Sequence, residues 1–221
     1  MLCCFAFIEH FSHISYSNGF SKLWGAATYF GHYNQLLYTL EPQIRLIDRP
    51  EKYDQSLLNS GIGTKIMSPF QIWLGQTYIN YLGTNDIAED VGRAVLNEYR
   101  IWEQIMWHRP FSEELASRTR LEQRRAFQSA EWAVRFRERA YWTIPFNETL
   151  SFALSDEFFL NLKSVSWVTT STLDQNRIFI GFFYKFTSNL GLNISYINQY
   201  INKRTKEYNN GIVLNLIMYT F

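Results

Sequence analysis

Polar and apolar residues alternate with a period of two along almost the whole chain, and this pattern constrains the fold more than any other feature. Residues 97–107 read NEYRIWEQIMW, which places Glu98, Arg100 and Trp102 on one side and Tyr99 and Ile101 on the other. Successive side chains of a β-strand point to opposite faces, whereas a helix repeats every 3.6 residues. The same alternation recurs in VRFRERA (134–140) and RIFIGFFYKF (177–186). The sequence therefore predicts an all-β protein.

One segment admits a second interpretation. RTRLEQRR (118–125) consists mostly of good helix formers, as does the region 113–142 around it. A helix here would be polar almost all round, with Leu121 as its one apolar residue and no stripe to bury. A strand instead separates a charged face of Arg118, Arg120, Glu122 and Arg124 from a face of Thr119, Leu121 and Gln123. We therefore predict a strand, and the alternative is a soluble, basic helical protein.

The two strand faces are unusual for a sheet in water. The formal net charge is only +1, yet one face carries many charges that need partners, and 18% of the residues are aromatic. No apolar run approaches the roughly 18 residues of a membrane-spanning helix. In an outer-membrane barrel the charged face turns to the lumen and the apolar face to lipid. The sheet must then close, because hydrocarbon does not tolerate an unpaired backbone edge.

We predict a closed antiparallel transmembrane β-barrel over residues 20–221, with short periplasmic turns and longer extracellular loops. Eleven segments alternate: 20–30, 35–48, 54–67, 70–82, 96–109, 114–126, 131–144, 149–162, 174–187, 190–203 and 211–221. Bacterial single-chain barrels have even strand numbers, so we expect twelve strands, the first from residues 4–15, or ten if 20–30 is partial. Interfacial aromatic anchors are expected at Trp24, Tyr38, Tyr78, Tyr99, Trp107, Trp142, Tyr184, Tyr196 and Tyr219.

Both ends of the chain carry features of an exported protein. LCCFAFI (2–8) is similar to the apolar part of a signal peptide, so we expect residues 1–19 to be a truncated signal peptide, with a short buried segment as the alternative. The two cysteines, Cys3 and Cys4, both lie there, which excludes a disulfide framework elsewhere. Tyr219 and Phe221 end an alternating strand, a pattern that resembles the sorting signal read by the barrel assembly machinery.

The chain resembles a family of uncharacterised Gram-negative outer-membrane barrel proteins, catalogued as a domain of unknown function. The resemblance spans residues 20–221 and rests on LYTLEPQIRLID, NEYRIWEQIMWHRPF, RTRLEQRR, VRFRERA, DEFFLN, DQNRIFIGFFY and ISYINQY, in this order. It implies location in the bacterial outer membrane and a closed antiparallel barrel. It implies no activity.

The candidate functional site is the charged face of the strands. The residues expected to form a lumen network are Glu41, Arg45, Glu98, Arg100, Arg118, Arg120, Glu122, Arg124, Arg135, Arg137, Arg139, Glu157 and Arg177, with Lys65 as a further cation. Arginine binds carboxylates at two points, so one interpretation is a largely packed lumen braced by ion pairs, with a structural or binding role. Because cations exceed acids in this set, the alternative is a narrow anion-selective channel.

Other features give weaker predictions. Glu103, Glu138 and Asp156 fall on the outward face, where a charge is costly in lipid. A second alternative is a lipid-modifying enzyme built on His108, Ser112 and Glu113, but this set falls at a periplasmic turn, so we predict no catalysis. No phosphate loop or metal-spaced cluster occurs, so no cofactor or metal is expected. The expected partners are outer-membrane lipid, the barrel assembly machinery and small anions, and not nucleic acid.

Overall fold

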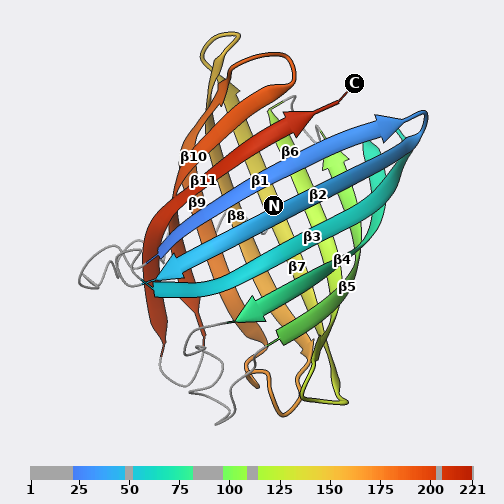
Figure 1. Ribbon diagram of the computed structural model, residues 1–221, viewed down its shortest axis with the longest axis vertical. Helices are drawn as coiled ribbons and strands as arrows, with labels where there is room; N and C mark the ends of the chain where they lie inside the picture. The colour runs from blue at the N-terminus through green and yellow to red at the C-terminus, as the bar shows by residue number, and fades with distance from the viewer. Residues whose placement is uncertain (1–21, 48–51, 82–96, 109–113, 203–205, 221) are drawn as a thin grey trace.

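The computed structural model describes residues 22–47, 52–81, 97–108, 114–202 and 206–220. These contain eleven β-strands, which follow one another around a closed barrel (Figure 1). The strands are β1 (Lys22–Tyr33), β2 (Leu36–Ile47), β3 (Lys52–Met67), β4 (Phe70–Tyr81), β5 (Asn97–His108), β6 (Leu115–Ala126), β7 (Trp132–Pro145), β8 (Leu150–Lys163), β9 (Leu173–Lys185), β10 (Leu190–Ile201) and β11 (Glu207–Tyr219). Each coincides with a predicted segment to within a few residues, so the period of two located the strands correctly.

The barrel closes through its first and last strands. All consecutive strands pair antiparallel, but β1 pairs with β11 in parallel, from Lys22 opposite Gly211 to Phe30 opposite Tyr219. Consecutive strands alternate in direction, so strands one and eleven point the same way and their pairing has to be parallel. The predictions of twelve or ten strands and of a wholly antiparallel wall are therefore wrong for the described residues. The segment 4–15, expected as an additional strand, lies outside them.

The longest connections gather at one end of the barrel. The hairpins β1–β2, β3–β4, β7–β8 and β9–β10 turn within two to four residues at one rim, where β11 also ends (Figure 1). β4 ends and β5 begins at the opposite rim, as do β8 and β9, so the two pairs of strands with the longest sequence separations (82–96 and 164–172) are joined there. We call these the short-turn rim and the long-loop rim. The two longest connections share one rim as predicted, but short and long connections do not alternate strictly. The β2–β3 connection at the long-loop rim has four residues, and the β5–β6 connection at the short-turn rim has six.

The two faces of the wall differ as the sequence indicates. Outward-facing Ile62 and Leu74 are exposed by 56% and 52% of their surface, whereas inward-facing Trp102 and Glu122 are almost completely buried. Apolar residues therefore face outward, and the interior holds charges together with rings. Near the long-loop rim, Leu57, Ile79, Trp167 and Val168 form a small apolar cluster that fills part of the interior. None of the described residues forms a helix that is long and apolar enough to cross a membrane.

Candidate functional site

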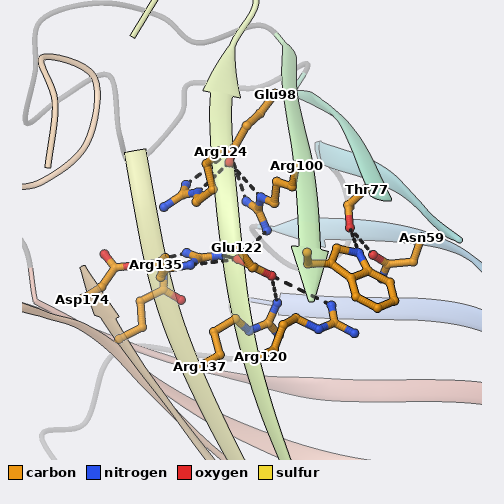
Figure 2. A network of polar contacts seen from close by, with 12 residues as sticks. Asn59, Thr77, Glu98, Arg100, Arg120, Glu122, Arg124, Arg135, Arg137 and Asp174 are labelled. Atoms are coloured by element: carbon orange, nitrogen blue, oxygen red, sulfur yellow. Dashed lines mark hydrogen bonds and ion pairs between the residues drawn. The ribbon is translucent and has the colours of Figure 1, made fainter. Parts of the chain in front are cut away.

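Glu122 on β6 lies at the centre of an ion-pair network inside the barrel (Figure 2). Its Oε2 accepts hydrogen bonds from Arg135 Nε at 3.0 Å and Nη2 at 2.6 Å, and its Oε1 accepts one from Arg137 Nη1 at 2.5 Å. Arg100 and Arg120 each hold a guanidinium nitrogen 3.9 Å from the same carboxylate. Cations from β5, β6 and β7 thus surround one anion, which ties these three strands together.

Glu98 on β5 forms a second centre. Arg100 donates to its two oxygens at 2.7 and 3.0 Å, and Arg124 donates to the same oxygens at 2.6 and 3.3 Å. The hydroxyl of Tyr81 on β4 donates to Oε2 at 2.8 Å. Arg100 and Arg124 stand directly opposite each other on β5 and β6, where two like charges would repel. The carboxylate of Glu98 bridges them and removes this repulsion.

Glu157 and Asp174 extend the network to β8 and β9. Glu157 Oε1 accepts bonds from Arg137 Nε at 3.1 Å and Nη2 at 2.6 Å, and it also pairs with Arg118 from β6. Asp174 Oδ2 accepts a bond from Arg135 Nη1 at 3.1 Å. The Arg118–Glu157 and Arg135–Asp174 pairs each reach over an intervening strand, so the long side chains cross-link strands that are not neighbours in the sheet.

Trp102 fills the interior beside this network. Its indole lies over two glycines, because a Cβ at Gly75 would stand 2.1 Å from Cζ2 and a Cβ at Gly61 2.5 Å from Cη2. Its Nε1 donates to Thr77 at 3.1 Å, and Thr77 in turn contacts Asn59 (Figure 2). Glycines on β3 and β4 therefore make the space that a large ring from β5 occupies.

Hydrogen bonds of neutral side chains link Thr77 through Asn59 to Glu41 on β2. Asn59 Nδ2 donates to Glu41 Oε1 at 3.1 Å, and Thr28 Oγ1 donates to Glu41 Oε2 at 3.0 Å. Thr28 also lies 3.0 Å from Asn215 Oδ1 on β11. Glu41 was predicted as part of the Arg/Glu network, but the hydrogen bonds that the structure gives it come from neutral side chains.

A cavity of about 750 Å³ runs along the interior. It is lined by Lys22, Thr169 and Ile201 near the long-loop rim and by Lys65 and Thr220 near the short-turn rim. Eleven of the thirteen predicted lumen residues line this cavity: Glu41, Arg45, Arg100, Arg118, Arg120, Arg124, Arg135, Arg137, Arg139, Glu157 and Arg177. Glu98 and Glu122 are fully buried behind them. The charged face of the strands is therefore the inner wall of the barrel.

The sequence-based predictions were wrong for Trp24 and did not include Asp174, although both side chains lie in the interior. The prediction of Trp24 at a membrane interface is wrong, because its side chain is 3% exposed and the centroid of its ring lies 4.0 Å from Cζ of Arg45 and 5.1 Å from Cζ of Arg177. Asp174 was not singled out. Arg177 faces inward, so strict alternation would turn Gln175 inward and Asp174 outward. A β-bulge interrupts the alternation here, because Phe159 pairs with Gln175 whereas the next residue, Leu160, pairs with Leu173. Asp174 is the extra residue and is turned inward.

The outward-facing acids each have neutral partners. Glu103 accepts a bond from Gln123 Nε2 at 3.0 Å, and Asp156 accepts one from Asn176 Nδ2 at 2.6 Å. Glu138 accepts bonds from Ser117 and Thr119. All three lie within strands and away from the lumen, as the alternation predicted. Hydrogen bonds across the sheet lower the cost of holding these carboxylates on an apolar face.

The remaining predicted residues lie at the ends of strands or outside the described residues. Tyr219 lies at the short-turn rim and stacks on Phe30, with ring centroids 5.8 Å apart. His108 ends β5, whereas Ser112, Glu113, Phe221 and the segment 1–19 lie outside the described residues. Within the described ranges, no group of three or more His, Cys, Asp or Glu side chains is arranged to hold a metal ion.

Comparisons with known proteins follow from the sequence and from the fold. A family model described as "Protein of unknown function (DUF2490)" matches residues 21–210. The chain belongs to the DUF2490 family. This agrees with the resemblance found in the sequence motifs, and it assigns no activity.

This DUF2490 chain is also similar to one further sequence and to one solved structure. An "Uncharacterized protein MexAM1_META1p0181" of Methylorubrum extorquens is 28% identical over 183 residues, which are 80% of this chain and 77% of that protein. A solved structure titled "NanC porin structure in rhombohedral crystal form" matches with a TM-score of 0.53 and 11% identity, covering 87% of this chain and 97% of the porin. At this identity the second match shows the fold alone, which is porin-like.

Proposed function

We propose that this DUF2490 protein is a bacterial outer-membrane barrel whose lumen is a narrow, anion-selective path braced on one side by the Arg/Glu network. The porin-like fold supports the location, since a closed sheet with an apolar outer face is what a membrane demands of β-structure. Exposed aromatic rings at both rims add support. Trp142 and Tyr184 lie towards the short-turn rim, and Tyr78 and Phe127 lie towards the long-loop rim.

The observation that carries the proposal is the charge balance along the cavity. Eleven Lys and Arg side chains line it, against six carboxylates when Glu98 and Glu122 behind the wall are counted with Glu41, Asp54, Glu157 and Asp174. The cavity is lined by residues from both rims, so this positive wall extends along the barrel rather than forming one local pocket. A low-dielectric wall of one sign raises the local concentration of the opposite ion.

The second candidate is a barrel with a purely structural role. Trp102 and Phe159 are almost completely buried in the interior, and the ion pairs between β5 and β9 occupy much of one side. These features narrow the lumen and favour a packed barrel. They leave Arg45, Arg139 and Arg177 without a carboxylate within 4.0 Å among the described residues, which a purely structural network would not need. The proposal includes no catalytic step, no cofactor and no nucleic-acid partner, and the lipid and assembly-machinery partners follow from the proposed location.

Ion conductance across a planar bilayer tests the proposal. We expect the refolded chain to conduct, and a KCl gradient to give a reversal potential of the sign for anion preference. The preference should be largest near 0.1 M salt, where the Debye length is about 10 Å, and should fall towards 1 M salt, where it is about 3 Å. Flat traces from correctly folded protein would favour the structural role, and a preference for cations would overturn the proposal.

A further inference from the structure

Three arginines of the lumen form no ion pair with the carboxylates of the network. Arg45 on β2, Arg139 on β7 and Arg177 on β9 have no carboxylate within 4.0 Å among the described residues, although all three line the cavity. Their hydrogen-bond partners are neutral. Arg45 Nε donates to Gln43 at 2.8 Å, Arg139 donates to Ser155 at 2.8 and 3.2 Å, and Arg177 Nη2 donates to Gln175 at 2.8 Å. Glu157 is the Cα partner of both Arg139 and Arg177 across the sheet, but its carboxylate pairs with Arg118 and Arg137 instead. None of the three arginines therefore has a directly paired counter-charge within the described part of the chain.

Two aromatic rings gather these arginines into one place. The Cζ atoms of Arg45 on β2 and Arg177 on β9 both lie over the ring of Trp24, 4.0 and 5.1 Å from its centroid. Trp24 meets Phe179 edge-on at 6.4 Å, and the Cζ of Arg139 lies 4.3 Å from the centroid of Phe179. Ring faces attract guanidinium groups but carry no net charge, so they orient the three cations without cancelling them.

Two buried donors at this cluster lack an acceptor. Arg177 Nε and Trp24 Nε1 are inaccessible to solvent and have no hydrogen-bond partner, and both side chains are more than nine-tenths buried. Arginine and tryptophan side chains can only donate, so the missing partner has to be an acceptor. A buried polar group without a partner costs free energy, and a small side-chain shift that brings either donor to an anion in the cavity would recover part of this cost.

We infer that Arg45, Arg139 and Arg177, oriented by Trp24 and Phe179, form a binding subsite for a small oxyanion. The ligand class is a solute that carries a carboxylate, sulfate or phosphate group. Several oxygens on one centre match the planar forks of arginine, whereas chloride offers a single point without this geometry. The inference deepens the proposed function and rests on it for the access of the solute to the lumen.

Titration calorimetry on the full chain, refolded in detergent, tests the subsite. The probes are sodium sulfate, phosphate and acetate, each added at constant ionic strength against sodium chloride. We expect saturable binding of at least one oxyanion in preference to chloride. Arg177→Gln should raise the Kd about tenfold, because one charge-assisted contact is lost. The matched control is Arg125→Gln, which removes the same charge from an exposed side chain that contacts Ser129 and Trp132 outside the cavity. The control should bind as the wild type does.

A second variant guards against misfolding. Arg177→Lys keeps the charge while losing the fork, so we expect weaker binding than in the wild type with unchanged β-structure in far-UV circular dichroism. Equal affinity in the wild type and Arg177→Gln, or chloride binding as tightly as every oxyanion, would overturn the subsite. Anion-selective conductance without saturable binding would likewise overturn the subsite, while it would still support the anion-selective path of the proposed function. Saturable binding without conductance would support the subsite and overturn the proposal that anions pass through the lumen.

Discussion

Gly75 packs against the indole of Trp102, so closely that a Cβ at position 75 would stand 2.1 Å from Cζ2 of the ring. The backbone oxygen of Ser60 would be only 2.5 Å away on another side. The missing side chain at position 75 is therefore what allows Trp102, the largest of the fully buried side chains, to approach the wall this closely. The close packing of Gly75 and Trp102 helps to set the width of the interior here, and the pattern of charges in the sequence does not predict it.

Gly75→Ala should destabilise the barrel. The added methyl group would force the Trp102 ring away from β4, and overpacking of this kind typically costs about 1–3 kcal/mol. The measurement is urea unfolding of the refolded protein, followed by far-UV circular dichroism. Gly25→Ala is the matched control, because a Cβ at Gly25 meets nothing within 4 Å. Equal unfolding midpoints for the two variants would contradict the packing of Trp102 against Gly75.

The strands could be predicted because alternation is a local property that every strand repeats. RTRLEQRR illustrates this. Its residues favour a helix, but the segment is a strand whose two faces differ in environment: Arg120, Glu122 and Arg124 are buried, and Arg125 is exposed. The strand number could not be predicted in the same way. It depends on whether the ends of the wall meet in parallel, and this is a non-local contact between β1 and β11.

The particular ion pairs were beyond the sequence for a different reason. Facing residues share a side of the wall, but the length of an arginine side chain decides which carboxylate it reaches. Arg118 stands opposite Arg139 in the β6–β7 register, yet it pairs with Glu157 one strand further on. The bulge at Asp174 changed the inward direction locally, and the small residues of β1 gave Trp24 no clear face. Alternation predicts the side of the wall that a residue faces but not its partner.

Glu122→Gln should weaken the network at its centre. Arg135 and Arg137 would keep a hydrogen-bond acceptor but lose the buried negative charge that they share. Removing one partner of a buried ion pair usually costs about 3–5 kcal/mol, and we expect the lower end because the amide oxygen still accepts a bond. Urea unfolding measures the change. Glu103→Gln is the control, since its carboxylate is on the outer face and accepts from neutral Gln123. A loss of stability in the control as large as in Glu122→Gln would contradict the central role of Glu122.

Ile194→Arg should reveal whether the outer face meets lipid. Ile194 is 48% exposed on β10 and stands between outward-facing Phe182 and Leu214 in the sheet. An arginine near the bilayer midplane of such a barrel costs about 2–4 kcal/mol, but only about 0–1 kcal/mol near an interface. Phe186→Arg, just beyond the end of β9, is therefore the control. Unfolding from phospholipid vesicles measures both variants, and equal costs would argue against a membrane-embedded band at Ile194.

The parallel seam between β1 and β11 can be tested by cross-linking. Ala27 and Leu216 are Cα partners across this seam, and the alternation places both on the outer face. Neighbouring strands lie about 4.8 Å apart, which is within the range that a disulfide spans, so the pair Ala27→Cys and Leu216→Cys should form a disulfide under mild oxidation. Cys3 and Cys4 would be replaced by serine beforehand, so that only the introduced thiols react. The control pair is Ala27→Cys with Leu192→Cys, because Leu192 is the partner of Leu216 on β10 and lies one strand further from β1.

A gel shift under non-reducing conditions reports the disulfide bond. A bond in the control pair but not in the seam pair would mean that β1 and β11 are not neighbours, whereas a bond in the seam pair alone fixes the closure at eleven strands.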